Sequence, residues 1–159
     1  MIKAGDRIPA ASIRQVTADG ANDVSTDEFF RGKKVALFAV PGAFTSTCSI
    51  KHLPSFANNA SALKAKGVDV IACIAVNDAA VLRAWGEQNK TQDKVVMLSD
   101  GNGDLTRSMG LEVDLTKSGM GKRSRRYSML VENGVVKRLN LEEPGAFGVS
   151  SGDHMLTQI

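Results

Sequence analysis

The residue with the most evident chemistry is Cys48, which closes the segment Pro41-Gly-Ala-Phe-Thr-Ser-Thr-Cys48. An apolar run from Val35 to Val40 precedes the segment, and a helix-like pattern begins near Cys48. The sequence therefore predicts a thiol at the point where a buried strand ends and a helix starts. Free backbone N–H groups and the positive end of the helix dipole lie at such a point, and both favour a thiolate. We expect Cys48 to act as a nucleophile.

A lowered pKa alone does not make a cysteine a fast nucleophile. A free cysteine has a pKa of about 8.5 and is about 3% thiolate at pH 7, so complete ionisation gains only about thirtyfold. Part of that gain is lost, because nucleophilicity falls together with the pKa. The remaining acceleration must come from groups that hold the substrate and stabilise the leaving group. A fixed cation and hydrogen-bond donors are therefore expected around the sulfur.

The elements that must position this thiol alternate between strands and helices. Pro54 lacks a backbone N–H, so a helix that spans it is expected to bend or restart there. Continuous apolar strands separated by helices are typical of a mixed sheet that is covered on both faces. Strands are predicted at residues 34–40, 68–76 and 95–99, and helices at 47–66, from 77 or 78 through 87, and at 105–109.

The two ends of the chain predict further elements. Asn133-Gly134 is a strong hairpin signal between the runs 126–131 and 135–139. Ser150 or Ser151 can cap a last helix that ends at Ile159. Residues 1–30 are poorly patterned and are expected to hold a β-hairpin with Asp19-Gly20 at its tip. A β-α-β unit followed by a hairpin and a terminal helix is the plan of the thioredoxin fold, with this hairpin as an N-terminal extension.

Length and composition set broad limits. The 159 residues suffice for one domain over residues 1–159, and 43% hydrophobic with 23% charged residues is ordinary for a soluble protein. The apolar runs are strand-sized and the N-terminus lacks the apolar core of a signal peptide, so we expect no membrane association and a cytoplasmic protein. The two cysteines cannot form a disulfide framework, and the net charge of +3 demands no anionic partner.

The segment around Cys48 also carries a family resemblance. It matches the peroxiredoxin pattern of a proline, three residues, a threonine, two residues and a cysteine. The residues Ser49-Ile-Lys-His52 and Arg123-Ser-Arg-Arg126-Tyr are similar to the peroxiredoxin-5 (type II) subfamily, and the similarity runs from Gly5-Asp-Arg-Ile-Pro9 to the C-terminal helix. Members of that subfamily usually carry a second proline where this chain has Ser46, so its loop is expected to be less rigid.

The resemblance implies roles for four residues and a homodimer packed near the active-site loops. Cys48 becomes the peroxidatic nucleophile of an antioxidant thiol peroxidase, which needs no cofactor. Thr45 hydrogen-bonds the peroxide and the thiolate, and Arg126 is the active-site arginine. A guanidinium suits that role because it stays charged and presents several donors in one plane. Pro41 shields the pocket and shapes the loop.

The motif around Cys48 does not identify the thiol that regenerates it. Cys73 is the only other cysteine, and it lies three residues before the end of the predicted strand 68–76. At about 3.3 Å per residue it sits roughly 10 Å below the sheet edge, beyond the Cα separation of a disulfide. Direct bonding would need local unfolding. We favour an external thiol, namely glutathione, glutaredoxin or thioredoxin, and keep Cys73 as a possible resolving cysteine and otherwise a small buried apolar residue.

Other motifs have simpler explanations. His52 lies four residues after Cys48 and could form a Cys–His pair, but no Asp or Asn partner is identifiable, so a supporting role is expected. The basic run 122–126 lacks stacking aromatics except Tyr127, and we expect one buried arginine with solvated neighbours and no nucleic-acid binding. The acidic run 100–104 lacks the terminal glutamate of a calcium loop. No cluster has metal-ligand or dinucleotide-binding spacing.

These observations favour a thiol-dependent peroxidase that reduces hydrogen peroxide and alkyl hydroperoxides through a sulfenic acid at Cys48. The alternative is a peroxide sensor or redox-relay protein that passes oxidation to a partner by disulfide exchange. Turnover separates the two, since a sensor is oxidised once per chain. A thiol-disulfide oxidoreductase is disfavoured because the chain has no Cys-x-x-Cys motif.

Overall fold

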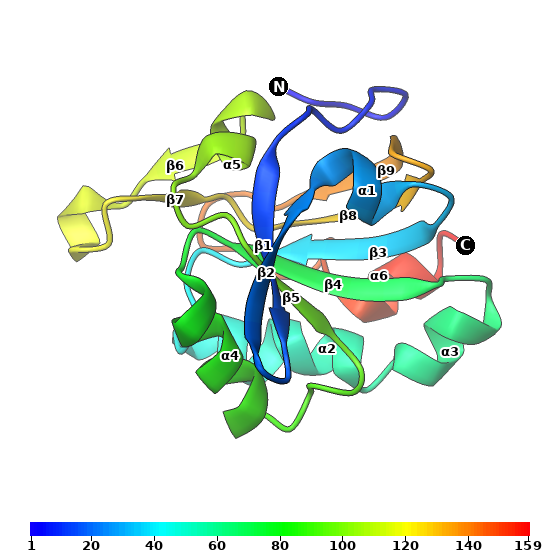
Figure 1. Ribbon diagram of the computed structural model, residues 1–159, viewed down its shortest axis with the longest axis horizontal. Coiled ribbons are helices and arrows are strands. Elements are labelled where there is room, and N and C mark those ends of the chain that lie inside the picture. Colours follow the sequence, from blue (N-terminus) through cyan, green and yellow to red (C-terminus); the bar gives the residue numbers. More distant parts are fainter.

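Seven strands form one mixed sheet in the order β2-β1-β5-β4-β3-β8-β9 (Figure 1). This is a computed structural model, and it describes residues 1–159. The strands are β1 (Ser12–Thr17), β2 (Gly20–Ser25), β3 (Lys34–Ala39), β4 (Val70–Ala75), β5 (Val96–Ser99), β8 (Tyr127–Glu132) and β9 (Val135–Leu141), while β6 (Glu112–Asp114) and β7 (Lys122–Ser124) form a separate two-stranded sheet.

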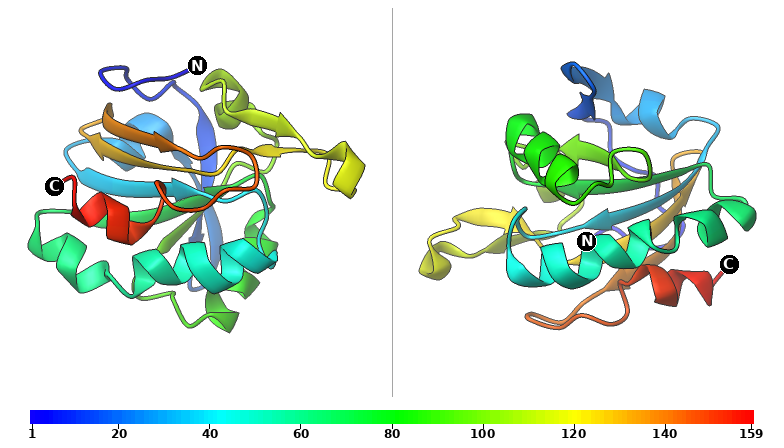
Figure 2. Two further views of the ribbon diagram at one scale, coloured as in Figure 1. Left: turned by 180° about the vertical axis from the view of Figure 1, so that it is seen from behind. Right: turned by 90° about the horizontal axis from the view of Figure 1, so that it is seen from below.

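Helices cover both faces of the seven-stranded sheet. Figure 2 shows α2, α3 and α6 together on one side of it. Buried side chains of these helices and of α4 share one apolar core, and those of α1 and α5 share the other. No helix combines the length and the apolar character needed to cross a membrane. The helices are α1 (Thr26–Phe30), the π-helical segment η1 (Cys48–His52), α2 (Leu53–Ala57), α3 (Ala60–Ala65), α4 (Ala79–Gln88), α5 (Asp104–Ser108), the 3-10 turn η2 (Thr116–Ser118) and α6 (Gly152–Leu156).

The central strand β3 is apolar from Val35 to Ala39 because both of its faces are covered. Along β3, Ala36 and Phe38 face one core, whereas Val35 and Leu37 face the other. Successive side chains of a strand point to opposite faces, so a strand covered on both faces must be apolar throughout. The neighbours β3 and β4 are both buried in this way. Because the two strands run parallel, their carboxyl ends lie at the same edge of the sheet.

The expected thioredoxin-like plan is confirmed. Strands β3 and β4 pair in parallel across the helices η1, α2 and α3, and β8 and β9 form an antiparallel hairpin. The order β4-β3-β8-β9, followed by α6, is the core arrangement of that fold. The N-terminal hairpin is present as β1 and β2, and β1 joins the main sheet through β5. Helix α4 begins at the cap Asp78, whose side chain accepts from the Val81 N–H.

The helix predicted over 47–66, with a bend or restart expected at Pro54, is divided into η1, α2 and α3. The π-helical η1 gives way to α2 at Leu53, beside Pro54, and helical backbone continues through the proline. The Leu53 N–H bonds to the Cys48 carbonyl, five residues earlier, so the helix is widened just before the proline. The break falls at Asn58 and Asn59, between α2 and α3.

Two further elements differ from the sequence prediction. The β6–β7 pair was not predicted, because its three-residue strands carry no apolar alternation; it projects from the body of the molecule (Figure 1). The last helix is capped by Ser151 as expected, but it ends at Leu156 rather than Ile159. The side-chain amide of Gln158 pairs with that of Asn140 on β9 at 2.8 and 2.9 Å, which draws the final residues to the sheet.

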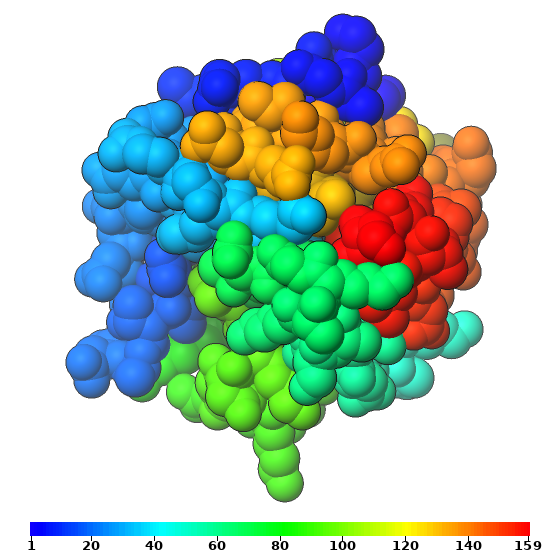
Figure 3. Space-filling view, turned by 90° about the vertical axis from the view of Figure 1, so that its right-hand side faces the viewer, coloured from blue at the N-terminus to red at the C-terminus, as the bar shows by residue number.

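The C-terminal segment is hydrogen-bonded to α2 and to the residue that follows α3. In Figure 3 its residues lie directly against those of the α3 region. Lys66 Nζ donates to the carbonyls of Leu156 and Ile159 at 3.1 and 3.0 Å. The N–H of Gly152 donates to Ser55 Oγ at 3.0 Å, so α6 touches the backbone of α2. A Cβ on Gly152 would lie 2.4 Å from the Ser55 carbonyl oxygen.

Replacing Gly152 with alanine should therefore destabilise the protein. The new methyl group would clash with backbone atoms of Ser55 that cannot rotate away, and overpacking of this kind costs about 1–3 kcal/mol. Gly148→Ala is the matched control, because a Cβ there meets nothing within 4 Å, and its effect should stay below about 1 kcal/mol. Urea denaturation of both variants measures the difference, and equal midpoints would contradict the close packing of α6 on α2.

Candidate active site

The thiol lies at the place predicted for it. Cys48 follows the loop 41–47 that leaves β3, begins η1 and has no exposed surface. The loop is held by short-range contacts: Thr45 Oγ1 donates to the Gly42 carbonyl at 2.7 Å, and the Ala43 N–H donates to Asn77 Oδ1 at 2.9 Å. Phe44 takes a positive φ of 66°, which turns the chain sharply toward the helix.

Arg126 reaches the sulfur from the neighbouring strand. Tyr127 pairs with Ala39, so Arg126 stands beside the residue at which β3 gives way to the loop. Its Nη2 donates to Cys48 Sγ at 3.1 Å, and its Nη1 donates to His52 Nδ1 at 2.9 Å. A permanent positive charge thus lies against a buried sulfur, and it stabilises negative charge there.

His52 supports the arginine rather than the sulfur. Because Arg126 donates to Nδ1, the ring proton must lie on Nε2, which donates to the Ser150 carbonyl at 3.0 Å. The ring is fully buried between Phe38 and Phe147. Burial, with the nearby Arg126 charge, lowers the pKa of His52 to about 3. The imidazole is therefore neutral at physiological pH and serves as an acceptor for the guanidinium.

Sequence reasoning missed Glu142 and Ser150. Glu142 is buried, and its Oε2 accepts from the Ser150 N–H and the Ser150 hydroxyl at 2.9 and 2.7 Å. The Ser150 carbonyl in turn accepts from His52. A line of hydrogen bonds thus connects a carboxylate to the arginine at the sulfur. Neither residue belongs to a motif, and the burial of Glu142 leaves no mark in the sequence that could have identified the pair.

Thr45 and Pro41 flank the site without touching the sulfur. The Thr45 hydroxyl donates to Gly42, so its lone pairs remain free to accept from another group. Pro41 is half-buried, and its carbonyl faces Arg123 Nη1 at 3.5 Å. Arg123 Nε also donates to the Met120 carbonyl, at 2.8 Å. The β6–β7 segment is therefore tied to the loop that precedes Cys48.

A cavity of about 250 Å³ leads to Arg126. Pro41 and Thr47 contribute one side of it, and apolar residues including Leu115 and Pro144 contribute another. A water molecule occupies about 30 Å³ of the liquid, so this cavity has room for more than a small peroxide. It is the space from which a substrate can approach the cation beside Cys48.

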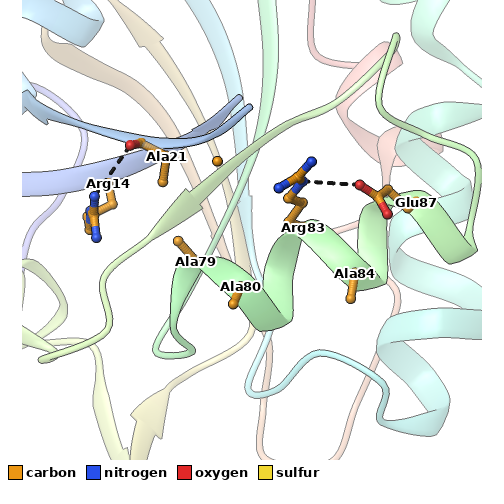
Figure 4. A pocket seen from close by; sticks show the side chains of 8 residues that line it. Arg14, Ala21, Ala79, Ala80, Arg83, Ala84 and Glu87 are labelled. Carbon is orange, nitrogen blue, oxygen red and sulfur yellow. Dashed lines mark hydrogen bonds and ion pairs between the residues drawn. The ribbon is translucent and has the colours of Figure 1, made fainter. Parts of the chain in front are cut away.

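A larger cavity of about 450 Å³ lies elsewhere, between the β1–β2 hairpin and α4 (Figure 4). Its two arginines are already engaged: Arg83 pairs with Glu87 at 3.2 Å, and Arg14 donates to the Ala21 carbonyl at 3.3 Å. Unlike the smaller cavity, it is lined neither by Arg126 nor by any residue of the loop 41–47. The reactive chemistry of the chain therefore belongs to the smaller cavity.

Cys73 is a free, fully buried thiol on β4. It faces the same apolar core as Cys48. Burial raises the pKa of the Cys73 thiol well above its usual value, and the nearby Cys48 raises it further. It is therefore held as a neutral thiol in this conformation, which makes it a weak nucleophile.

The basic run 122–126 is used within the molecule. Lys122 pairs with Asp114 at 3.1 Å across the β6–β7 pair, and Arg125 donates to the Glu142 carbonyl at 3.3 Å. Arg123 contacts the Pro41 carbonyl, and Arg126 donates to the Cys48 sulfur. Each cation of the run therefore has a partner within the molecule. No group of three or more His, Cys, Asp and Glu side chains is arranged to hold a metal ion.

We predict that His52 stays neutral, as the Nε2–H tautomer, from about pH 8 down to about pH 5, because its pKa is about 3. Unfolded histidine binds a proton below about pH 6.5, so the unfolded state holds more protons between that pH and about 3. The free energy of unfolding should therefore fall as the pH decreases through this window. Imidazole nitrogen NMR gives the tautomer directly; a protonated His52 at pH 5 in the folded protein would contradict the prediction.

Comparison with known proteins agrees with this geometry. The family model described as Redoxin matches residues 3–156. Peroxiredoxin-2E-2, chloroplastic, of Oryza sativa subsp. japonica is 54% identical over 98% of this chain and 71% of its own length. Peroxiredoxin-2E, chloroplastic, of Arabidopsis thaliana is 49% identical over 98% and 68%. The crystal structure of reduced Prx3 in complex with h2o2 from Vibrio vulnificus superimposes with a TM-score of 0.95 at 47% identity, covering 99% of each chain.

These relatives correct one expectation and settle another. The cytoplasmic location expected from the N-terminus is contradicted, because the two plant relatives just described are chloroplastic proteins. The resemblance read from the cysteine motif is confirmed over nearly the whole chain. The chain belongs to the peroxiredoxin family of thiol peroxidases, in its type II, peroxiredoxin-5-like branch.

Proposed function

We propose that this peroxiredoxin reduces hydrogen peroxide and alkyl hydroperoxides at Cys48 and is regenerated by an external thiol: glutathione, with or without glutaredoxin, or thioredoxin. The observation that carries the proposal is the 3.1 Å contact between Arg126 Nη2 and Cys48 Sγ next to a cavity. Residues 1–159 act as one domain in this proposal.

The reaction requires three steps. The Cys48 thiolate attacks the terminal peroxide oxygen, the O–O bond breaks, and the sulfur becomes a sulfenic acid. The other oxygen leaves as hydroxide or alkoxide and takes up a proton, while the Arg126 guanidinium stabilises its developing charge. A thiol then attacks the sulfenic sulfur, releasing water and forming a mixed disulfide. A second thiol attacks that disulfide and returns Cys48 to its reduced form.

Thr45 and Pro41 complete the peroxide site in this proposal. The Thr45 hydroxyl, three residues before Cys48, would turn from the Gly42 carbonyl to hydrogen-bond the peroxide. Pro41 forms a wall of the cavity and excludes water. The apolar part of the cavity, which includes Val113, Leu115 and Ala146, supports alkyl hydroperoxides as substrates beside hydrogen peroxide.

An external reductant is favoured over Cys73. Burial keeps Cys73 as a neutral thiol, which is a weak nucleophile in this conformation. Cys48 has no exposed surface, so a bulky thiol can reach the sulfur only after the loop 41–47 or η1 moves. The same opening would expose the sulfenic acid to a partner protein, which keeps a peroxide sensor or redox relay as the alternative function.

Measured turnover tests the proposal. Cys48→Ser should abolish peroxide consumption, because no other thiol touches Arg126. Cys73→Ser is the matched control and should keep turnover with at least one of glutathione, glutathione with glutaredoxin, and thioredoxin. Loss of turnover with every donor in Cys73→Ser would make Cys73 the resolving cysteine. Single oxidation of each chain, with a trapped mixed-disulfide partner, would favour the sensor.

A homodimer packed near the active-site loops is part of the proposal. Three large apolar side chains are exposed around the site, namely Phe44 on the loop, Ile50 on η1 and Val149 beside Ser150. Exposed apolar residues close together are typical of protein interfaces. Small-angle scattering should give twice the chain mass of 16.9 kDa, and Ile50→Glu should halve it. A monomeric mass for the unmodified protein would exclude the dimer.

A further inference from the structure

We propose that Glu142 is a positioning residue, which fixes the Arg126 guanidinium against Cys48 through Ser150 and His52. This inference rests on the proposed peroxidase reaction at Cys48. Glu142 touches neither the sulfur nor the guanidinium by hydrogen bond. Its effect on the reaction would pass through two neutral groups, the Ser150 peptide and the His52 ring.

Glu142 fixes the loop 143–151 by hydrogen bonds to one carboxylate oxygen. Glu142 Oε2 accepts from the Gly148 N–H at 2.6 Å, the Ser150 N–H at 2.9 Å and the Ser150 hydroxyl at 2.7 Å. Burial opposes ionisation, but these hydrogen bonds outweigh it and lower the pKa of Glu142. An ionised carboxylate is a strong acceptor, and three donors on one oxygen leave the loop little freedom.

The same loop is joined to the arginine from two sides. The Ser150 carbonyl accepts from His52 Nε2 at 3.0 Å, and His52 Nδ1 accepts from Arg126 Nη1 at 2.9 Å. Phe147, in the same loop, packs against the His52 ring with centroids 5.1 Å apart. The backbone N–H of Glu142 also donates to the Arg126 carbonyl at 3.1 Å. Glu142 thus fixes both the backbone of Arg126 and the acceptor of its side chain.

The indirect arrangement has an electrostatic advantage. A carboxylate bonded directly to Arg126 would neutralise much of its field at the sulfur and occupy two of its donors. A neutral imidazole orients the guanidinium with one hydrogen bond and leaves its charge available to the sulfur and the peroxide oxygens. The carboxylate supplies rigidity through Ser150, without a direct hydrogen bond to the guanidinium.

A comparison of two reactions of Cys48 tests this role. Stopped-flow rate constants are measured at pH 7 with hydrogen peroxide, which needs Arg126, and with iodoacetamide, which reports general thiol reactivity. The ratio of the two rate constants removes changes in folding and in thiolate fraction. We expect the ratio to fall roughly tenfold in Glu142→Gln and roughly threefold in Ser150→Ala, consistent with weakened hydrogen bonds to a charged group.

Two control variants separate positioning from stability and from net charge. Ser151→Ala removes the N-cap of α6 without touching Glu142, so it should lower the melting temperature and leave the ratio unchanged. Glu28→Gln, at an exposed position on α1, removes one negative charge far from the site and should also leave the ratio unchanged.

The outcomes are distinct. Unchanged ratios in folded Glu142→Gln and Ser150→Ala, with a peroxide-selective wild type, would overturn the role of Glu142 alone. If Glu142→Gln fails to fold, the ratio of the peroxide and iodoacetamide rate constants is compared between Ser150→Ala and Ser151→Ala. Equal ratios in these two variants would refute the proposal. A wild-type protein whose Cys48 shows no preference for peroxide would refute the proposed function, and the role of Glu142 with it.

Discussion

The site depends on holding a guanidinium against a sulfur that has no contact with solvent. Arginine brings a flexible side chain, which by itself would sample many rotamers, and ordering it costs entropy. The chain meets that cost by placing Arg126 beside the end of β3 and by giving its Nη1 a buried neutral acceptor, His52. The sheet register and the C-terminal segment both serve that contact. Without it, Cys48 would be one more buried thiol.

The pairing of β3 with β8 brings Arg126 to Cys48. Cys48 and Arg126 lie 78 residues apart in the sequence, and no local interaction could bring them together. The antiparallel register sets Tyr127 against Ala39, and a slip of one residue would turn the arginine to the opposite face. Buried side chains on both faces of β3 hold the register, so the packing of the core also determines the geometry of the site.

The sequence predicted what depends on local patterns. The strands, the Asn133-Gly134 hairpin and the Cys48 motif each have a signature within a few residues, and the family resemblance supplied Arg126. It did not predict the π-helical turn before Pro54, the β6–β7 pair or the Glu142–Ser150 contacts. These features arise from tertiary packing between distant segments, and a buried glutamate has no periodicity that distinguishes it from a surface one. His52 showed the same limit, since its partners, Arg126 and Ser150, are far from it in the chain.

The position of the 142–152 segment bears on how the protein is made. Chains fold from the N-terminus during synthesis, and the β3–β4 unit with its helices can pack before the last residues have left the ribosome. At that stage His52 has no Ser150 carbonyl, and Gly152 is not yet seated on Ser55. The cation at Cys48 is therefore unsupported in the nascent chain. The arginine at Cys48 gains its full set of hydrogen-bonded supports only after the 142–152 segment has packed on η1 and α2.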